Sequence, residues 1–326
     1  EVRVGGLELR GGLRIHSFPN DSRTYLEPRG RLVFETGIHQ FSAAGGNYHQ
    51  EVIGVNDRRD VANVFTAWTR APDLDDGQGG VIEGVASAWH AIGGYKVTPQ
   101  PWLELVAEGY YKSLDNVPVA RWTALPEFTT DLQAASGEVL GLDSRVEFRF
   151  PNVYAYLGYG ISRVTYFAQA GALPARYRDE LGPGDTFEYR PPHDRRHQVT
   201  ALLSGTVAGV ELSARFQFGS GLPFTRALGF DIFIDPRQPF NPFDQNGDPR
   251  VIYERPFEGQ LPTFHRLDLS AERTFPIGGA ADLTVQAALI NAYDRANLFY
   301  YDTFTLRRVD QLPIIPSFGV KVAFND

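Results

Sequence analysis

The sequence predicts an all-β protein, an antiparallel up-and-down transmembrane β-barrel segment of about twelve strands. Two observations predict this fold. Apolar and polar residues alternate along many segments of about ten residues, which is the period of a strand with one apolar and one polar face. The connections between these segments alternate between very short and very long, as in barrels with short periplasmic turns and long extracellular loops.

The clearest alternation lies near the end of the chain. Leu267, Leu269 and Ala271 alternate with charged or polar residues, and the pattern returns at residues 283–289 and 318–324. In a soluble sandwich the apolar face of such a strand packs on a core, whereas in a membrane barrel it faces lipid and the polar face lines the lumen. The polar faces here are strongly charged and the strands are long, so we predict a barrel.

The first half of the chain supplies six of the predicted strands. They lie at residues 7–15, 27–35, 38–48, 86–98 and 102–114, and in a strand that ends at residue 150 after a loop reaching about residue 134. Turn residues at 19–22 separate the first two. Residues 50–83 form a long irregular connection, which would count against a compact soluble domain but is ordinary in an extracellular loop.

The second half supplies six more strands. They lie at residues 153–167, 197–207 and 210–219, with three in the stretch from residue 261 to residue 324. Long loops, including residues 221–262, alternate with tight turns predicted at residues 36–37, 99–100, 151–152, 208–209 and 276–280. An even number of strands leaves both termini on the short-turn, periplasmic side.

Composition excludes several other classes. A net charge of -8 argues against a nucleic-acid partner, which usually requires a basic face. The absence of cysteine excludes a disulfide framework and thiolate metal sites. A mean hydropathy of -0.25, without any apolar run of about 18 residues, argues against a helical membrane protein. The chain begins without a methionine or a signal peptide, so we expect it to be mature or truncated at its front.

Several segments together resemble TonB-dependent outer-membrane receptors. They are Glu-Pro-Arg at 27–29, Tyr-His-Gln at 48–50, Glu-Gly-Tyr-Tyr-Lys-Ser-Leu-Asp-Asn at 108–116, Phe-Gly-Ser-Gly-Leu-Pro-Phe-Thr at 218–225, and residues 261–269, 289–299 and 311–319 of the last three strands. Each motif alone is weak, but their order and spacing are specific. The resemblance covers nearly the whole chain from residue 7 onward.

The resemblance implies that residues 1–326 are the C-terminal portion of a 22-stranded barrel, with the plug and the early strands absent. It implies energised uptake of a scarce nutrient, such as siderophore-iron or cobalamin, across the outer membrane of a Gram-negative bacterium. The implied partners are outer-membrane lipid, the missing plug and strands, the TonB complex acting through that plug, and the small-molecule nutrient. The alternative is a self-sufficient twelve-stranded passive outer-membrane channel. One departure is that Phe324, the terminal aromatic, is followed by two more residues.

Aromatic residues near the loop side are the candidates for substrate binding. We predict Tyr48, His49, Phe224, Phe240 and Phe243, because they lie at strand ends or in Pro-Phe pairs of a long loop, where ligand contacts concentrate. The alternative for most strand-end aromatics is an interfacial girdle that anchors the barrel at the level of the headgroups.

The remaining polar motifs do not form a reactive centre in the predicted topology. Asp244 to Asp248 has the spacing of calcium ligands, but Pro249 and the missing final glutamate favour a solvated loop. His193 and His197 lie four residues apart, about 13 Å along a strand. We predict no catalytic site, no metal site and no cofactor, and thus no enzyme.

Charged residues on the predicted polar faces form the largest remaining group. They are Glu8, Arg10, Arg14, Glu104, Glu108, Arg145, Glu147, Arg149, Glu211, Arg215, Arg266, Asp268 and Glu272. Two roles are compatible with their position: contacts with a plug, or cross-strand ion pairs on a wet wall.

Overall fold

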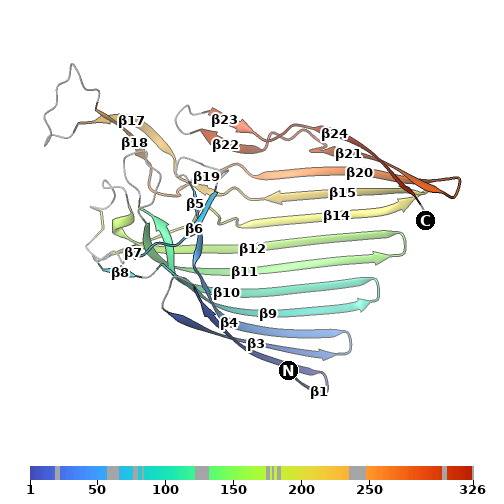
Figure 1. Cartoon of the computed structure of the whole chain (residues 1–326), viewed down its shortest axis with the longest axis horizontal. Helices are drawn as coiled ribbons and strands as arrows, with labels where there is room; N and C mark the ends of the chain where they lie inside the picture. Colours follow the sequence, from blue (N-terminus) through green and yellow to red (C-terminus); the bar gives the residue numbers. More distant parts are fainter. Residues whose placement is uncertain are drawn as a thin grey trace.

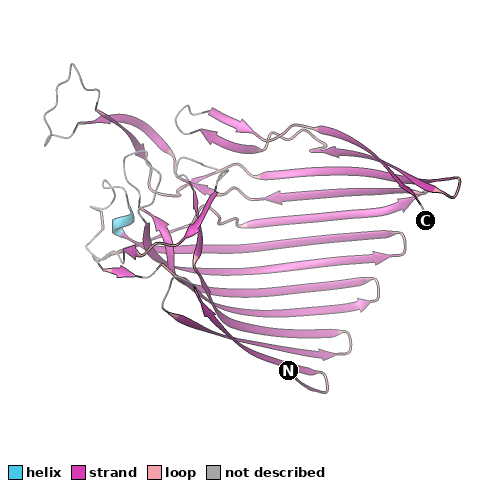
Figure 2. Ribbon diagram, viewed as in Figure 1, coloured by secondary structure: helices cyan, strands magenta, loops and turns pink. Residues whose placement is uncertain are grey.

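The computed structural model consists mainly of one antiparallel sheet whose long strands are neighbours in chain order (Figure 1). It describes residues 1–18, 23–56, 66–75, 80–82, 84–121, 132–173, 177, 180–181, 185–234, 247–302 and 307–324. Figure 2 shows that strands dominate these residues, together with one short helical turn, η1 (Ala170–Ala172). In the described part of the chain, no helix is long and apolar enough to cross a membrane.

The main sheet runs through the strands in the order β1-β2-β3-β4-β9-β10-β11-β12-β14-β15-β20-β21-β24. Their bounds are β1 Val2–Val4, β2 Leu7–Ser17, β3 Thr24–Thr36, β4 His39–Gln50, β9 Ala86–Gln100, β10 Leu103–Ala120, β11 Leu132–Phe150, β12 Val153–Gln169, β14 His197–Val207, β15 Val210–Gly219, β20 Phe264–Ile277, β21 Ala281–Ile290 and β24 Ile315–Phe324. All of the predicted strands are present, and the short β1 precedes them. The prediction of an up-and-down antiparallel barrel segment is confirmed.

Short turns join the strands in pairs at one end of the sheet. The turns predicted at 151–152 and 208–209 lie where expected, whereas those predicted at 36–37 and 99–100 lie at 37–38 and 101–102. The shift arises because Thr36 still pairs with His39, and Gln100 with Leu103. At residues 208–209 both φ angles are positive, 51° and 75°, as a type I′ hairpin turn requires.

The pairing register sorts the side chains into an apolar and a polar face. Leu212 pairs with Ala271, Ala271 with Ala287, and Ala287 with Phe318, so one apolar row crosses four strands. Residues on this face remain exposed, Phe318 to 82%. A continuous exposed apolar surface of this extent marks contact with a membrane or a partner rather than with water. Among the described residues, no second layer covers the apolar face of the sheet, as expected for a barrel wall.

The other end of the sheet carries the long connections, and several of them hold strands that the sequence did not predict. These strands are β5 Val52–Asn56, β6 Thr66–Arg70, β7 Leu74–Asp75, β8 Val81–Ile82, β13 Thr186–Tyr189, β16 Pro223–Phe224, β17 Ala227–Phe233, β18 Asp248–Tyr253, β19 Gly259–Gln260, β22 Leu298–Asp302 and β23 Arg307–Asp310. The segments predicted as irregular, 50–83 and 221–262, thus contain hairpins (Figure 1). Local pairing satisfies backbone groups that would otherwise depend on water.

One loop segment folds back onto the sheet and forms a core. We call the described residues between 170 and 196 the cap. Its Leu173 and Phe187 pack with Val119, Val164 and other buried residues at the loop ends of β10, β11 and β12. Val164 pairs with Val139, whose side chain points to the face opposite the exposed Leu140. The cap therefore covers the polar face of the sheet.

Two edges end the sheet within the described residues: β1 on one side and β24 on the other. Phe324 at the end of β24 pairs with Ala281, which directly follows the turn at 278–280, so this strand ends on the short-turn side. Figure 1 shows both ends of the chain toward that side.

Candidate ligand-facing surface at the loop end

A buried carboxylate lies at the loop end of β2, β3 and β4. Glu27 is 1% exposed and accepts hydrogen bonds from the Arg29 guanidinium at 2.8 Å and from the His49 backbone N–H at 2.8 Å. His16 Nδ1 lies 3.4 Å from one Glu27 oxygen, and Arg14 lies 3.6 Å from the other. Multiple donors of this kind offset the cost of removing a carboxylate from water.

The strand period explains why these groups meet. Arg14 and His16 are two residues apart on β2, as are Glu27 and Arg29 on β3, and Arg14 pairs directly with Glu27. Side chains two residues apart point to the same face of a strand. The carboxylate is buried, whereas the two arginines remain about half exposed. The cluster therefore presents positive charge to the space above the polar face.

Aromatic rings surround this carboxylate. The rings of Tyr25 and His49 lie 4.4 Å apart, and the Arg29 guanidinium lies 4.7 Å from the centre of the Tyr48 ring. The residues of this surface, named here the Glu27 patch, are Arg14, His16, Phe18, Tyr25, Glu27, Arg29, Tyr48, His49 and His90. At Gly46 an added Cβ would lie 3.1 Å from both Arg29 Cγ and Tyr48 Oη, so a glycine there leaves room for their stacking.

The structure brings together two of the five predicted binding residues. Tyr48 and His49 belong to the Glu27 patch, whereas Phe224 lies in β16, where it pairs with Gly259 of β19. Phe240 and Phe243 lie outside the described residues. Sequence reasoning missed the acidic centre of the patch. The available signal was one pair of titratable or charged residues, spaced two apart, at the loop end of each of two neighbouring predicted strands. The pairs are Arg14 with His16 and Glu27 with Arg29.

The two histidines considered as metal ligands contact different tyrosines. His193 lies 3.5 Å from the Tyr166 hydroxyl, whereas His197 lies 2.8 Å from the Tyr159 hydroxyl. Most of the calcium-like segment at 244–248 lies outside the described residues. Among the residues that are described, no group of three or more histidine, aspartate or glutamate side chains is placed to hold a metal ion.

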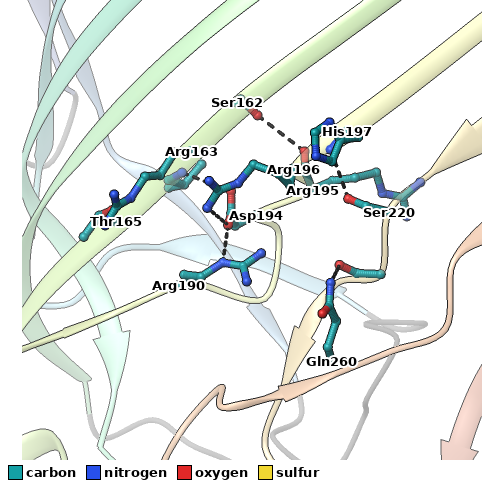
Figure 3. Close-up of polar contacts among 12 residues, drawn as sticks. Ser162, Arg163, Thr165, Arg190, Asp194, Arg195, Arg196, His197, Ser220 and Gln260 are labelled. Atoms are coloured by element: carbon teal, nitrogen blue, oxygen red, sulfur yellow. Dashed lines mark hydrogen bonds and ion pairs between the residues drawn. The ribbon is translucent and has the colours of Figure 1, made fainter.

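Asp194 fixes the cap to the sheet. Its side chain is fully buried and accepts hydrogen bonds from the Val164 backbone N–H at 3.0 Å and from Arg190 Nε at 2.6 Å, with Arg196 at 3.7 Å (Figure 3). Burial lowers the pKa of the neighbouring His193, and the charge of Asp194 opposes part of that shift. One carboxylate thus connects two arginines of the loop to the backbone of β12.

The cap also contacts a second loop. Tyr189 stacks on Phe257 with ring centres 5.3 Å apart, although the two residues are distant in sequence. Burial raises the pKa of Tyr189, so its hydroxyl stays neutral. This contact places two long connections side by side at the loop end of the wall.

A separate ionic network lies near the short turns on the polar face. Glu104 and Glu147 are nearly buried. Arg145 donates to Glu104 at 2.8 Å and lies 3.1 Å from Glu147, and Lys96 lies 3.4 Å from Glu104. Cross-strand ion pairing, one of the two predicted roles of the polar-face charges, is therefore present. Contact with a plug remains a prediction.

Comparisons with known proteins give a match in fold but not in sequence. No protein-family model and no curated protein matches the chain. Among solved structures, the FrpB iron transporter of Neisseria meningitidis is similar at 13% identity and a TM-score of 0.56, over 98% of this chain and 43% of that one. The ferric-catecholate import receptor Fiu of E. coli gives 12%, 0.55, 98% and 42%, and the copper transporter OprC gives 12%, 0.56, 99% and 45%.

These neighbours are TonB-dependent receptors, the family that the sequence motifs resemble. At such low identity the likeness establishes a shared barrel fold. The chain spans less than half of the length of these three structures. The neighbours are transporters and receptors rather than enzymes.

Proposed function

We propose that the chain forms the C-terminal part of the barrel of a TonB-dependent receptor in the outer membrane of a Gram-negative bacterium. It takes part in energised uptake of a scarce nutrient such as siderophore-iron or cobalamin, and it performs no chemistry. The observation that carries this proposal is the wall itself. Its apolar face is exposed and its polar face is charged. Among the described residues, β1 and β24 end the sheet without a further partner strand, as the wall of a wider barrel requires.

The chemistry of the Glu27 patch favours binding of an anionic nutrient complex. Two arginines surround one buried carboxylate, and the nearby rings of Tyr25, Tyr48 and His49 offer flat stacking surfaces. Arginine pairs well with carboxylate-like oxygens and stacks on aromatic faces. A ferric complex with anionic oxygen ligands fits both properties. We propose that Tyr48, His49, Arg14 and Arg29 contact it at the extracellular mouth.

The remaining predicted contacts lie in other loops. We propose that Phe224, Phe240 and Phe243 approach the nutrient from the connection between β15 and β20. The proposed partners are otherwise those of the family: outer-membrane lipid, the plug, the strands that complete the barrel, and the TonB complex acting through the plug.

A passive twelve-stranded channel would require closure of the sheet on itself. Spanning structures in lipid must satisfy every backbone group, so a closed channel needs β1 and β24 to pair. In the described residues these two strands are the ends of the sheet. The open edges favour the receptor over the channel.

Uptake of radiolabelled ferric siderophores by cells with and without TonB tests the proposal. We expect uptake to require TonB and to fall about tenfold or more in Arg29→Ala, since a hydrogen bond to a charged group contributes about 1.5–3 kcal/mol. Arg163→Ala is the matched control, because Arg163 pairs with Glu188 on the apolar side of β12. Uptake that persists unchanged without TonB would reject the receptor in favour of the channel.

A further inference from the structure

Arg273 is an arginine on the apolar face of the wall. Arg273 on β20 follows Leu269 and Ala271 at the same two-residue period, and it pairs with the exposed Val285 of β21. Its guanidinium lies 4.9 Å from the centre of the Phe275 ring. Among the described residues, no carboxylate lies within ion-pair distance of Arg273. A cation is therefore placed where the wall meets lipid.

The position along the strand sets its depth. His265, whose Nδ1 lies 2.8 Å from the Tyr293 hydroxyl, marks the polar loop-side border of β20. Arg273 is eight residues further, or about 27 Å along the strand at about 3.4 Å per residue. With a strand tilt of about 40°, this corresponds to about 20 Å of depth, close to the far border of an apolar band about 25 Å tall. Arg273 thus lies near the headgroups on the short-turn side.

A groove on the same face begins beside this arginine. It has a volume of about 680 Å³ and is lined by small side chains between larger ones, including Ala214, Ala271, Ala287, Leu203, Leu212 and Phe318. Ala271 is two residues from Arg273, and Ala287 is two residues from its partner Val285, so the groove continues directly from the arginine row. The apolar lining matches a hydrocarbon chain.

We propose that Arg273 and this groove form a phospholipid site. The guanidinium binds the phosphodiester through its paired N–H donors, and one acyl chain lies in the groove. An arginine at the border of the bilayer needs an anionic partner, and the phosphate supplies it. A second copy of the chain fits less well, because a two-fold contact through this face would bring another Arg273 toward the first.

Native mass spectrometry of the full protein, purified in an uncharged detergent, tests this site. The probes are phosphatidylglycerol, diacylglycerol with the same acyl chains, and inorganic phosphate. We expect the protein to retain one phosphatidylglycerol, and Arg273→Ala to retain about tenfold less, as for the loss of one charged hydrogen-bonded partner. Ala271→Phe, which fills the groove and leaves the arginine, is expected to reduce retention as well.

Arg163→Ala is the matched control, because it removes an arginine from the same face that is already paired with Glu188. It is expected to retain the lipid like the unaltered protein. Equal retention by Arg273→Ala overturns the proposal, as does equal retention of diacylglycerol or of inorganic phosphate alone. Heat-modifiable migration first confirms that each variant is folded.

The inference rests on the proposed membrane location but not on transport. Lipid retention is measured without any nutrient or TonB, so a failure of the uptake experiment leaves this test decisive. Conversely, an Arg273→Ala variant that loses the lipid and keeps TonB-dependent uptake supports both proposals.

Discussion

Leu140 and Leu173 belong to two regions with opposite environments. Leu140, on the apolar face of the wall, is 63% exposed, whereas Leu173, in the cap, is 0% exposed. The same side chain is exposed in one region and enclosed by protein in the other. The wall relies on lipid to cover its apolar residues, so it needs one layer only. The cap lies against the polar face at the loop ends of β10, β11 and β12, away from lipid, so protein must cover its apolar residues.

Buried carboxylates in the two regions differ in their partners. On the wall, buried carboxylates such as Glu104 are surrounded by basic side chains that remain partly exposed on the polar face. In the cap, the fully buried Asp194 is satisfied by a backbone N–H and by arginines of its own loop. The basic partners on the wall thus face a wet lumen, whereas the carboxylate of the cap pairs with its own loop and with the backbone of β12.

The largest expected difference comes from removing the same side chain in each region. Leu173→Ala should destabilise the cap by about 2–5 kcal/mol, because it leaves a cavity in a packed core. Leu140→Ala should change the stability of the wall much less, since detergent or lipid refills the space. Hydrogen exchange of the Val164 amide, which binds Asp194, reports the opening of the cap. Equal effects of the two substitutions would remove the distinction between the regions.

A charge introduced on the apolar face of the wall tests whether that face contacts lipid. Leu203→Arg, near the middle of β14, should destabilise the protein folded into vesicles by about 2–4 kcal/mol. Ser204→Arg is the matched control, because its side chain lies on the polar face one residue away. It should cost little in a wet lumen. A larger loss of stability in Ser204→Arg than in Leu203→Arg would mean that the lipid-facing and lumen-facing sides have been exchanged.

Gln133 of β11, beneath the cap, offers the opposite test. Its side chain is fully buried, and within the described part of the chain neither its oxygen nor its nitrogen has a hydrogen-bond partner. Gln133→Leu should therefore stabilise the cap by about 1–3 kcal/mol, the cost of an unsatisfied buried amide. Slower exchange of the Val164 amide would show it. Faster exchange would indicate that the amide of Gln133 has a partner in solution.

The wall could be predicted from the sequence because its period is local. Alternation at Leu212 or Ala271 needs no knowledge of neighbouring strands, and turn positions were in error by at most two residues where strands continued pairing. The cap could not be predicted, since Phe187 and Val119 meet only through long-range packing. The Glu27 patch lies between these cases. Its arginines were predicted on the polar face or in a motif, but the burial of Glu27 depends on three strands.

The smallest expected effect is the dependence of cap opening on pH. Burial lowers the pKa of His193 below its ordinary value of 6.5, so the docked cap binds fewer protons than a detached loop. The stabilisation is complete above about pH 6.5 and is lost as the pH falls through the lowered pKa of the docked histidine. Opening of the cap, measured by exchange at Val164 and corrected for intrinsic rates, should increase between about pH 7 and pH 5. His193→Phe keeps a ring beside Tyr166, whose centre lies 5.6 Å away, but cannot titrate. It should abolish this dependence, whereas an unchanged acid response in the variant would assign the titration to another group of the cap.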